Sequence, residues 1–209
     1  LLAEGNGLLV VDNLETVDDA RVIQFLDSLP FGVRALTTSR RTSVRVAVRP
    51  LTLAGMTDDE AREYVRSLRT QRGLGYISEL TISDIEKIRV ACDGLPLAMR
   101  WTLSQCNTVA ELLTYTERIA ISGTHDEELL EFCFRRVFEA MSGAEKAVLY
   151  VLSLFQRPLN TETLLTGSSL PQTRLVDATE DLISDSVIQR LFDPEQNDYV
   201  FMLLPITRS

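Results

Sequence analysis

The sequence has few of the residues that reactive sites use most often. It contains one histidine, His125, and three cysteines with no C-x-x-C spacing. A Ser-His-Asp or Cys-His catalytic site would depend on His125, which stands beside acidic residues at an expected helix start. The cysteines, at positions 92, 106 and 133, are odd in number and widely spaced. This argues against a disulfide framework or a zinc site and favours small buried thiols in a reducing compartment.

Long apolar runs and basic segments are also missing. No stretch approaches the ~20 apolar residues that a membrane span requires, and residues 1–5 lack the basic region of a signal peptide. We therefore expect a cytoplasmic protein with no membrane partner. The formal net charge is −9, from 30 acidic against 21 basic residues, of which only two are lysines. Such a chain should be repelled by nucleic acid and by anionic membranes.

A phosphate-binding loop is absent from the sequence. The pattern G-x-x-x-x-G-K-[S/T] does not occur, and neither Lys87 nor Lys146 follows a glycine. Gly5-Asn6-Gly7 has Val10 where a dinucleotide fingerprint needs a glycine. Because the chain opens almost at once on a strand and ends without a closing element, both ends look cut. We expect this fragment by itself to be inactive as a nucleotide hydrolase.

The first element that the sequence does contain is an apolar strand. Leu8-Leu9-Val10-Val11 predicts a strand buried on both faces, and the run stops at Asp12-Asn13. An apolar helix over 20–29 and a second strand from Val33 follow, and this strand ends in Thr38-Ser39-Arg40. Strand, helix and strand within ~30 residues are typical of a parallel sheet, whose strand tips share one rim. Asp12 and Arg40 should therefore emerge together, although Asp12-Asn13 also fits a turn in which the side chains bond the backbone.

The rest of the chain reads as helices followed by a hairpin. An edge strand over 44–48 precedes a helical region with capping boxes at Thr57/Glu60, Ser83/Glu86, Thr108/Glu111, Thr124/Glu127 and Ser142/Glu145. Helices over 126–139, 142–155, 161–166 and 170–184 precede strands over 187–192 and 199–204, which is a winged-helix topology. The predicted fold class is α/β plus α: part of a parallel-sheet core over 1–50, a helical domain over 51–123 and a winged-helix domain over 124–209.

Four short signals stand in a fixed order along the chain. They are the strand ending in Asp12, the segment Thr37 to Arg40, the tetrapeptide Gly94-Leu95-Pro96-Leu97, and the helical region with its winged helix. In this order the whole chain resembles the back half of an NB-ARC module, the nucleotide switch of STAND-class P-loop ATPases. The resemblance implies binding of ADP or ATP with Mg²⁺ in a longer parent, with the phosphate loop upstream of residue 1 and a sensor domain downstream. It also implies a signal-transduction switch that opens its domains and self-associates under nucleotide control.

The resemblance assigns roles to particular residues. Asp12 matches the Walker B aspartate that orders Mg²⁺, and Arg40 matches the sensor arginine that reaches the terminal phosphate. A guanidinium pairs with phosphate through two hydrogen bonds, so an arginine on this rim can distinguish ATP from ADP. Gly94, Leu95 and Pro96 match the motif whose proline packs near the nucleotide base. The same residues also suit the end of one helix and the first turn of the next.

Two departures from the family pattern leave the reaction open. Asn13 stands where a second acid usually orients the attacking water, and it cannot take a proton. Glu15 is the candidate to replace it as a catalytic residue, or it is a helix-entry acid. Leu204 stands where many relatives carry a histidine that contacts bound ADP. Whether the parent hydrolyses ATP is therefore left open.

Two other functions compete with the switch. A winged-helix transcriptional regulator would need a basic face, but the candidate recognition helix over 170–184 holds one basic residue against three acidic ones: Arg174 against Asp177, Glu180 and Asp181. DNA binding is therefore disfavoured. A degenerate, non-hydrolysing interaction scaffold is favoured by Asn13 and Leu204 and disfavoured by Asp12, Arg40 and Pro96.

Overall fold

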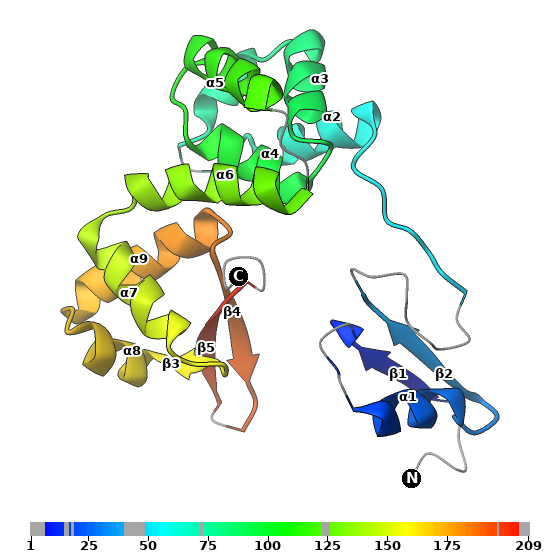
Figure 1. Cartoon of the computed structure of the whole chain (residues 1–209). Coiled ribbons are helices and arrows are strands. Elements are labelled where there is room, and N and C mark those ends of the chain that lie inside the picture. Colours follow the sequence, from blue (N-terminus) through cyan, green and yellow to red (C-terminus); the bar gives the residue numbers. More distant parts are fainter. Residues whose placement is uncertain are drawn as a thin grey trace. The chain divides into compact units, whose positions relative to one another are not determined.

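The computed structural model describes residues 7–14, 17, 19–39, 49–71, 73–122, 126–195 and 197–204. The chain forms two compact units, Leu1–Leu53 and Ala54–Ser209, and each is described by itself (Figure 1). Both contain helices and strands, so the mixed α and β class predicted from the sequence is confirmed. His125 and the predicted edge strand over 44–48 lie outside the described residues.

The first unit holds two parallel strands joined by a helix. β1 (Gly7–Val11) pairs with β2 (Val33–Thr37) in parallel, in register along their whole length. Between them lies α1 (Ala20–Asp27), whose N-cap is Asp19; the Asp19 carboxylate accepts a hydrogen bond from the backbone N–H of Arg21. This is the predicted strand, helix and strand, and the parallel pairing brings the carboxyl ends of β1 and β2 to one rim.

The prediction that β1 is buried on both faces is wrong. The side chains of Leu8 and Val10 are 67% and 59% exposed, and Leu36 of β2 is exposed beside them. Successive side chains of a strand point to opposite faces, and the described residues of this unit supply one helix. An unbroken apolar run such as that of β1 is expected where both faces of a strand are covered. Within the described part of this unit, however, the face that carries Leu8 and Val10 is exposed.

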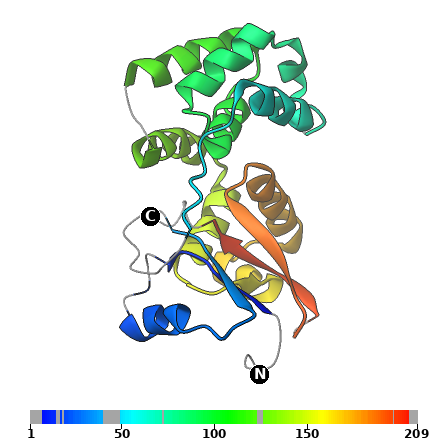
Figure 2. The same cartoon turned by 90° about the vertical axis from the view of Figure 1, so that its right-hand side faces the viewer.

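The second unit begins with a bundle of helices. Its elements are α2 (Asp58–Leu68), the 3₁₀ turn η2 (Gly75–Glu79), α3 (Ile82–Ala91), α4 (Pro96–Ser104), α5 (Val109–Ser122) and α6 (Asp126–Ala140). Helix α6 follows the expected boundary near residue 123 and packs against α4, as both views show (Figure 1 and Figure 2). The three cysteines are free and buried in this unit, as predicted. None of the described helices is both long and apolar enough to cross a membrane.

One of the predicted helix starts is wrong. The capping box of α3 is made by Thr81 and Asp84, not by Ser83 and Glu86. The helix starts two residues earlier than predicted, and the shorter aspartate closes the box as well as a glutamate would. At α5 and at α7 (Gly143–Ser153), the predicted N-terminal side chains do accept a hydrogen bond from the backbone N–H three positions on: Thr108 from Glu111 and Ser142 from Glu145. The pair at 124 and 127 lies outside the described residues and side chains.

The end of the second unit combines three helices with a small antiparallel sheet. The elements are α7 (Gly143–Ser153), β3 (Leu159–Asn160), α8 (Thr161–Ser168), α9 (Gln172–Ser184), β4 (Ile188–Asp193) and β5 (Asp198–Leu203). The strands lie in the order β3, β5, β4. The helices and the hairpin agree with the prediction. The two-residue strand β3 was missed, since it is too short to show any periodicity.

Candidate functional site

The carboxyl ends of β1 and β2 bring polar groups together at one rim. The hydroxyl of Thr38 donates a hydrogen bond to the carboxylate of Asp12, and the backbone N–H of Asn13 donates to Thr38 Oγ1 at 2.9 Å. The backbone N–H of Thr38 donates to the carbonyl of Val11 at 3.0 Å, and that of Leu14 donates to the carbonyl of Thr38 at 2.9 Å. The two strand tips are thus fixed to each other, with Asp12 exposed between them.

Among the described residues of this rim, Asp12 offers its carboxylate to a cation. Mg²⁺ prefers oxygen ligands and is commonly held by one or two carboxylates together with water and substrate phosphates. Among the described residues, no group of three or more His, Cys, Asp or Glu side chains could hold a metal ion. Asp12 fits a site in which a phosphate supplies the other ligands. Thr38, which bonds Asp12, was part of the predicted tip, but its contact with the aspartate was not foreseen.

Asn13 adopts a backbone conformation that supports the alternative role of this segment. Its φ is 53°, in the left-handed region that asparagine enters more readily than most residues. The backbone therefore leaves the extended conformation of β1 at Asn13, whether or not Asp12 binds a cation. The other predicted residues of this rim, Glu15 and Arg40, lie outside the described residues. Their roles stay predictions.

Gly94, Leu95 and Pro96 form the turn between α3 and α4 in the second unit. Gly94 has a φ of 67°, and its N–H donates to the carbonyl of Arg89 at 2.8 Å, which ends α3. Pro96 is the first residue of α4, where its missing N–H leaves no hydrogen bond unmade. The predicted helix end and helix start are confirmed. Pro96 is exposed, so its ring is accessible.

The Gly94 turn lies against the backbone that leads into α2. The N–H of Met56 donates to the carbonyl of Gly94 at 2.8 Å. A Cβ added at Gly94 would lie 2.7 Å from the Met56 nitrogen, and one added at Gly55 would lie 2.3 Å from the Asp93 oxygen. Both glycines are thus required by this close approach of two backbones. The sequence analysis missed Gly55, and the available signal was a glycine just before the Thr57 capping box.

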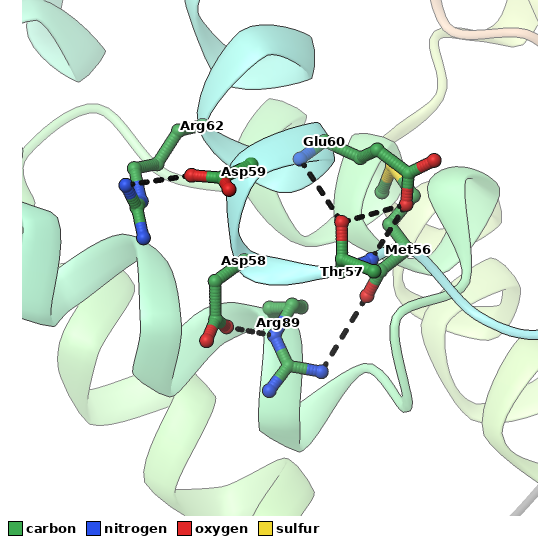
Figure 3. A network of polar contacts seen from close by, with 7 residues as sticks. All are labelled: Met56, Thr57, Asp58, Asp59, Glu60, Arg62 and Arg89. Atoms are coloured by element: carbon green, nitrogen blue, oxygen red, sulfur yellow. Dashed lines mark hydrogen bonds and ion pairs between the residues drawn. The ribbon is translucent and has the colours of Figure 1, made fainter.

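Polar contacts at the start of α2 hold this crossing in place (Figure 3). Thr57 and Glu60 form the predicted capping box, in which the Thr57 N–H donates to the Glu60 carboxylate at 2.8 Å. Arg89, at the end of α3, bonds the carboxylate of Asp58 and reaches the carbonyl of Met56 at 3.5 Å. The end of α3 is therefore tied to the start of α2, and the turn that carries Pro96 is rigidly supported.

Two clefts in the second unit do not coincide with the predicted site residues. One, of about 440 Å³, lies between α3 and α5 and is lined in part by Lys87, Val90 and Leu113. The other, of about 310 Å³, is lined by residues of α5 and by Arg136 of α6. Neither of these two clefts is lined by a residue of the Gly94 turn.

Comparison with known proteins adds no assignment. No protein-family model matches the chain, and no curated protein matches it. The candidate site therefore consists of two separately described groups, the rim with Asp12 and Asn13 in one unit and the Gly94 turn in the other. Their convergence on one ligand stays a prediction.

Proposed function

We propose that this chain is the nucleotide-dependent switch segment of a STAND-class NB-ARC ATPase. In the longer parent, ADP or ATP with Mg²⁺ would bind between an upstream phosphate loop and the rim that carries Asp12. Exchange of ADP for ATP would then bias the protein toward an open, self-associating state. A downstream sensor domain is the expected further partner.

The observation that carries the proposal is the fixed contact between Asp12 and Thr38. It holds an exposed carboxylate at the carboxyl end of a parallel strand, where open α/β sheets bind their ligands. Asp12 would supply a ligand to Mg²⁺, and the cation would neutralise charge on the phosphates. Arg40, two residues beyond Thr38 in the sequence, would pair with the terminal phosphate.

The C-terminal part supports a switching role more than a DNA-binding one. The order α7, β3, α8, α9, β4, β5 and the sheet order β3, β5, β4 support the proposal that this part is a winged helix, a relative of the helix-turn-helix. The exposed side chains of α9 include Asp177, Glu180 and Asp181 against Arg174, which gives this surface the same sign as DNA. We therefore propose that this part packs on the rest of the protein and moves with nucleotide state.

The test uses the protein expressed with the segment that precedes Leu1. We expect ADP or ATP to be released on denaturation and Mg²⁺-dependent nucleotide binding to weaken at least tenfold in Asp12→Asn. Asp27→Asn, an exposed acid at the end of α1, is the matched control and should bind as the wild type does. Arg40→Ala should lose the discrimination between ATP and ADP. Unchanged discrimination would remove Arg40 from the site.

A non-hydrolysing scaffold is the second candidate, and the geometry of Asn13 favours it. An amide with left-handed backbone follows Asp12 where a catalytic base is expected, so the rim has no proton acceptor at that position. The longer protein would then carry no nucleotide and show no thermal shift with ADP or ATP and Mg²⁺. Bound nucleotide with no turnover would instead indicate a switch driven by exchange alone.

A further inference from the structure

Helix α4 contacts the end of α9 through two neighbouring side chains. Arg100 donates a hydrogen bond from Nη2 to the carbonyl of Ser184, and Trp101 donates from Nε1 to the carbonyl of Asp185 at 2.8 Å. The last carbonyls of a helix have no partner within it, and the last turn of α9 has no basic residue. Helix α4, 84 residues earlier in the chain, thus caps the C-terminus of α9.

The rest of that helix end is already satisfied by the local backbone. The carbonyls of residues 181, 182 and 183 accept hydrogen bonds from the N–H groups of Asp185, Val187 and Ser186 at 2.9 to 3.0 Å. The carbonyl of Ser184 is the remaining acceptor of the last turn, and Arg100 fills it. The contact from α4 therefore completes the cap of α9.

Arg100 completes this cap at a cost to its own hydrogen bonding. Its side chain is buried, with 3% of the residue exposed, and its Nη1 has no hydrogen-bond partner. Burial lowers the pKa of the guanidinium, and Tyr64 and Asp185 oppose this shift. A buried charge with incomplete hydrogen bonds is destabilising relative to the same charge in water. Opening of the contact would return Arg100 to water and recover this energy.

Trp101 packs within the helical part of the unit, where α4 contacts α6. Its ring lies 5.3 Å from that of Phe134 in α6, at an interplanar angle of 45°. Next to it, Thr102 of α4 lies 3.8 Å from Cys133 Sγ of α6. Helix α9 packs instead on α7, α8 and β4. The two hydrogen bonds from Arg100 and Trp101 therefore join α4 to the end of α9, within a unit whose buried apolar cluster includes residues of both groups of elements.

We infer that Arg100 and Trp101 form a releasable latch between the helical part, α2 to α6, and the C-terminal part, α7 to β5. When the latch is closed, it caps α9 and buries the guanidinium. When it opens, Arg100 is rehydrated and the end of α9 loses its cap. This deepens the proposed switch by naming where its parts separate, but the latch is defined without nucleotide and can fail independently of it.

The sole tryptophan of the chain is Trp101, so its fluorescence reports on the latch directly. The experiment is a urea titration of the whole chain, followed by Trp101 emission with acrylamide quenching and, in parallel, by far-UV circular dichroism. A latch predicts that Trp101 becomes quenchable at lower urea than the loss of helical signal. Coincident transitions in the wild type would overturn the inference, and this comparison requires no variant.

Arg100→Met tests the cause of release. In Arg100→Met the Ser184 carbonyl loses its donor and the Asp185 carboxylate loses a nearby positive charge. Removing one partner from a buried polar contact is destabilising, so the latch should open more readily and the Trp101 transition should move to lower urea, further from the loss of helix. Arg66→Met, an exposed arginine on α2, is the matched control and should leave both transitions in place. A Trp101 transition in Arg100→Met at the same urea as in this control, or at higher urea, would overturn the inference. Nucleotide binding by the longer protein is measured separately, so failure of the latch leaves the proposed function standing.

Discussion

The two compact units differ most in how they bury apolar side chains. In the first, Leu14 and Leu26 are the buried apolar residues among those described, and Leu8 and Val10 are exposed on β1. In the second, one apolar cluster runs from α2 to β5 and includes residues of every helix. Unfilled apolar faces are typical of surfaces that meet another segment or molecule. The second unit holds its own core, whereas the sheet of the first has a face that its described residues leave uncovered.

The largest expected effect is a core truncation in the second unit. Ile88 of α3 is fully buried, so Ile88→Ala should lower the free energy of unfolding by about 2–5 kcal/mol. Urea unfolding followed by far-UV circular dichroism measures this. Val90→Ala, two residues along the same helix and 61% exposed, should change it by less than ~0.5 kcal/mol. Equal losses of stability in Ile88→Ala and Val90→Ala would contradict the burial of Ile88 in the core.

The Gly94 turn provides the next test. A second glycine, Gly73, allows the cost of backbone strain to be separated from the cost of a steric clash. Gly94→Ala adds a side chain at a φ of 67° and against the backbone of Met56, and we expect a loss of about 2–4 kcal/mol. Gly73 has a φ of 81° but no neighbour within 4 Å, so Gly73→Ala carries the backbone strain alone. Urea midpoints give the difference. Identical losses of stability in Gly94→Ala and Gly73→Ala would mean that the contact with Met56 does not contribute.

Asp185 makes a prediction about pH within the second unit. Burial raises the pKa of this carboxyl from its ordinary 3.8 to about 6, against the opposing effect of Arg100, and Glu145 and Asp181 add to the rise. The folded state therefore holds the proton more tightly than the unfolded chain, and the ionised form is destabilising above pH 6.

Asp185→Asn should accordingly raise the free energy of unfolding at pH 7 by about 1–3 kcal/mol. The advantage should shrink as the pH falls from 6 to 4 and disappear below the ordinary pKa. Urea titrations at several pH values measure it. Asp177→Asn, an exposed acid on α9, should show no such dependence. A gain for Asp185→Asn that is the same at pH 7 and pH 4 would show that ionisation is not its cause.

The smallest expected effect is on the uncovered face of the first unit. Leu8→Ala removes a side chain that is largely exposed and should change stability by less than ~0.5 kcal/mol in this chain. Leu26→Ala makes the same chemical change at a buried position of α1 and should cost about 2–5 kcal/mol. Hydrogen exchange of the β1 and β2 amides measures both. Comparable losses would mean that Leu8 is buried in solution and would end the contrast between the units.

Much of the local structure could be predicted, because its causes lie within a few residues. Gly94 and Pro96 ended and started helices where expected, and the polar ends of β1 and β2 met at one rim. The start of α3 was misplaced because Thr81 and Ser83 both offer a capping oxygen, and sequence alone does not rank them. The roles of Glu15 and Arg40, which lie outside the described residues, stay predictions.

The residues themselves determined the periodicity of the helices, the strand, helix and strand of the first unit, and the turn at Gly94, since propensity and capping act over one turn of chain. Only the tertiary structure decided which faces of the strands and helices are covered. It also decided that the backbone of Gly55 lies against that of Asp93, and that Arg100 and Trp101 reach the end of α9. Those contacts join residues that are 38 and 84 positions apart. A pattern read along the chain carries no signal for such pairs, because burial and hydrogen bonding depend on what arrives from elsewhere.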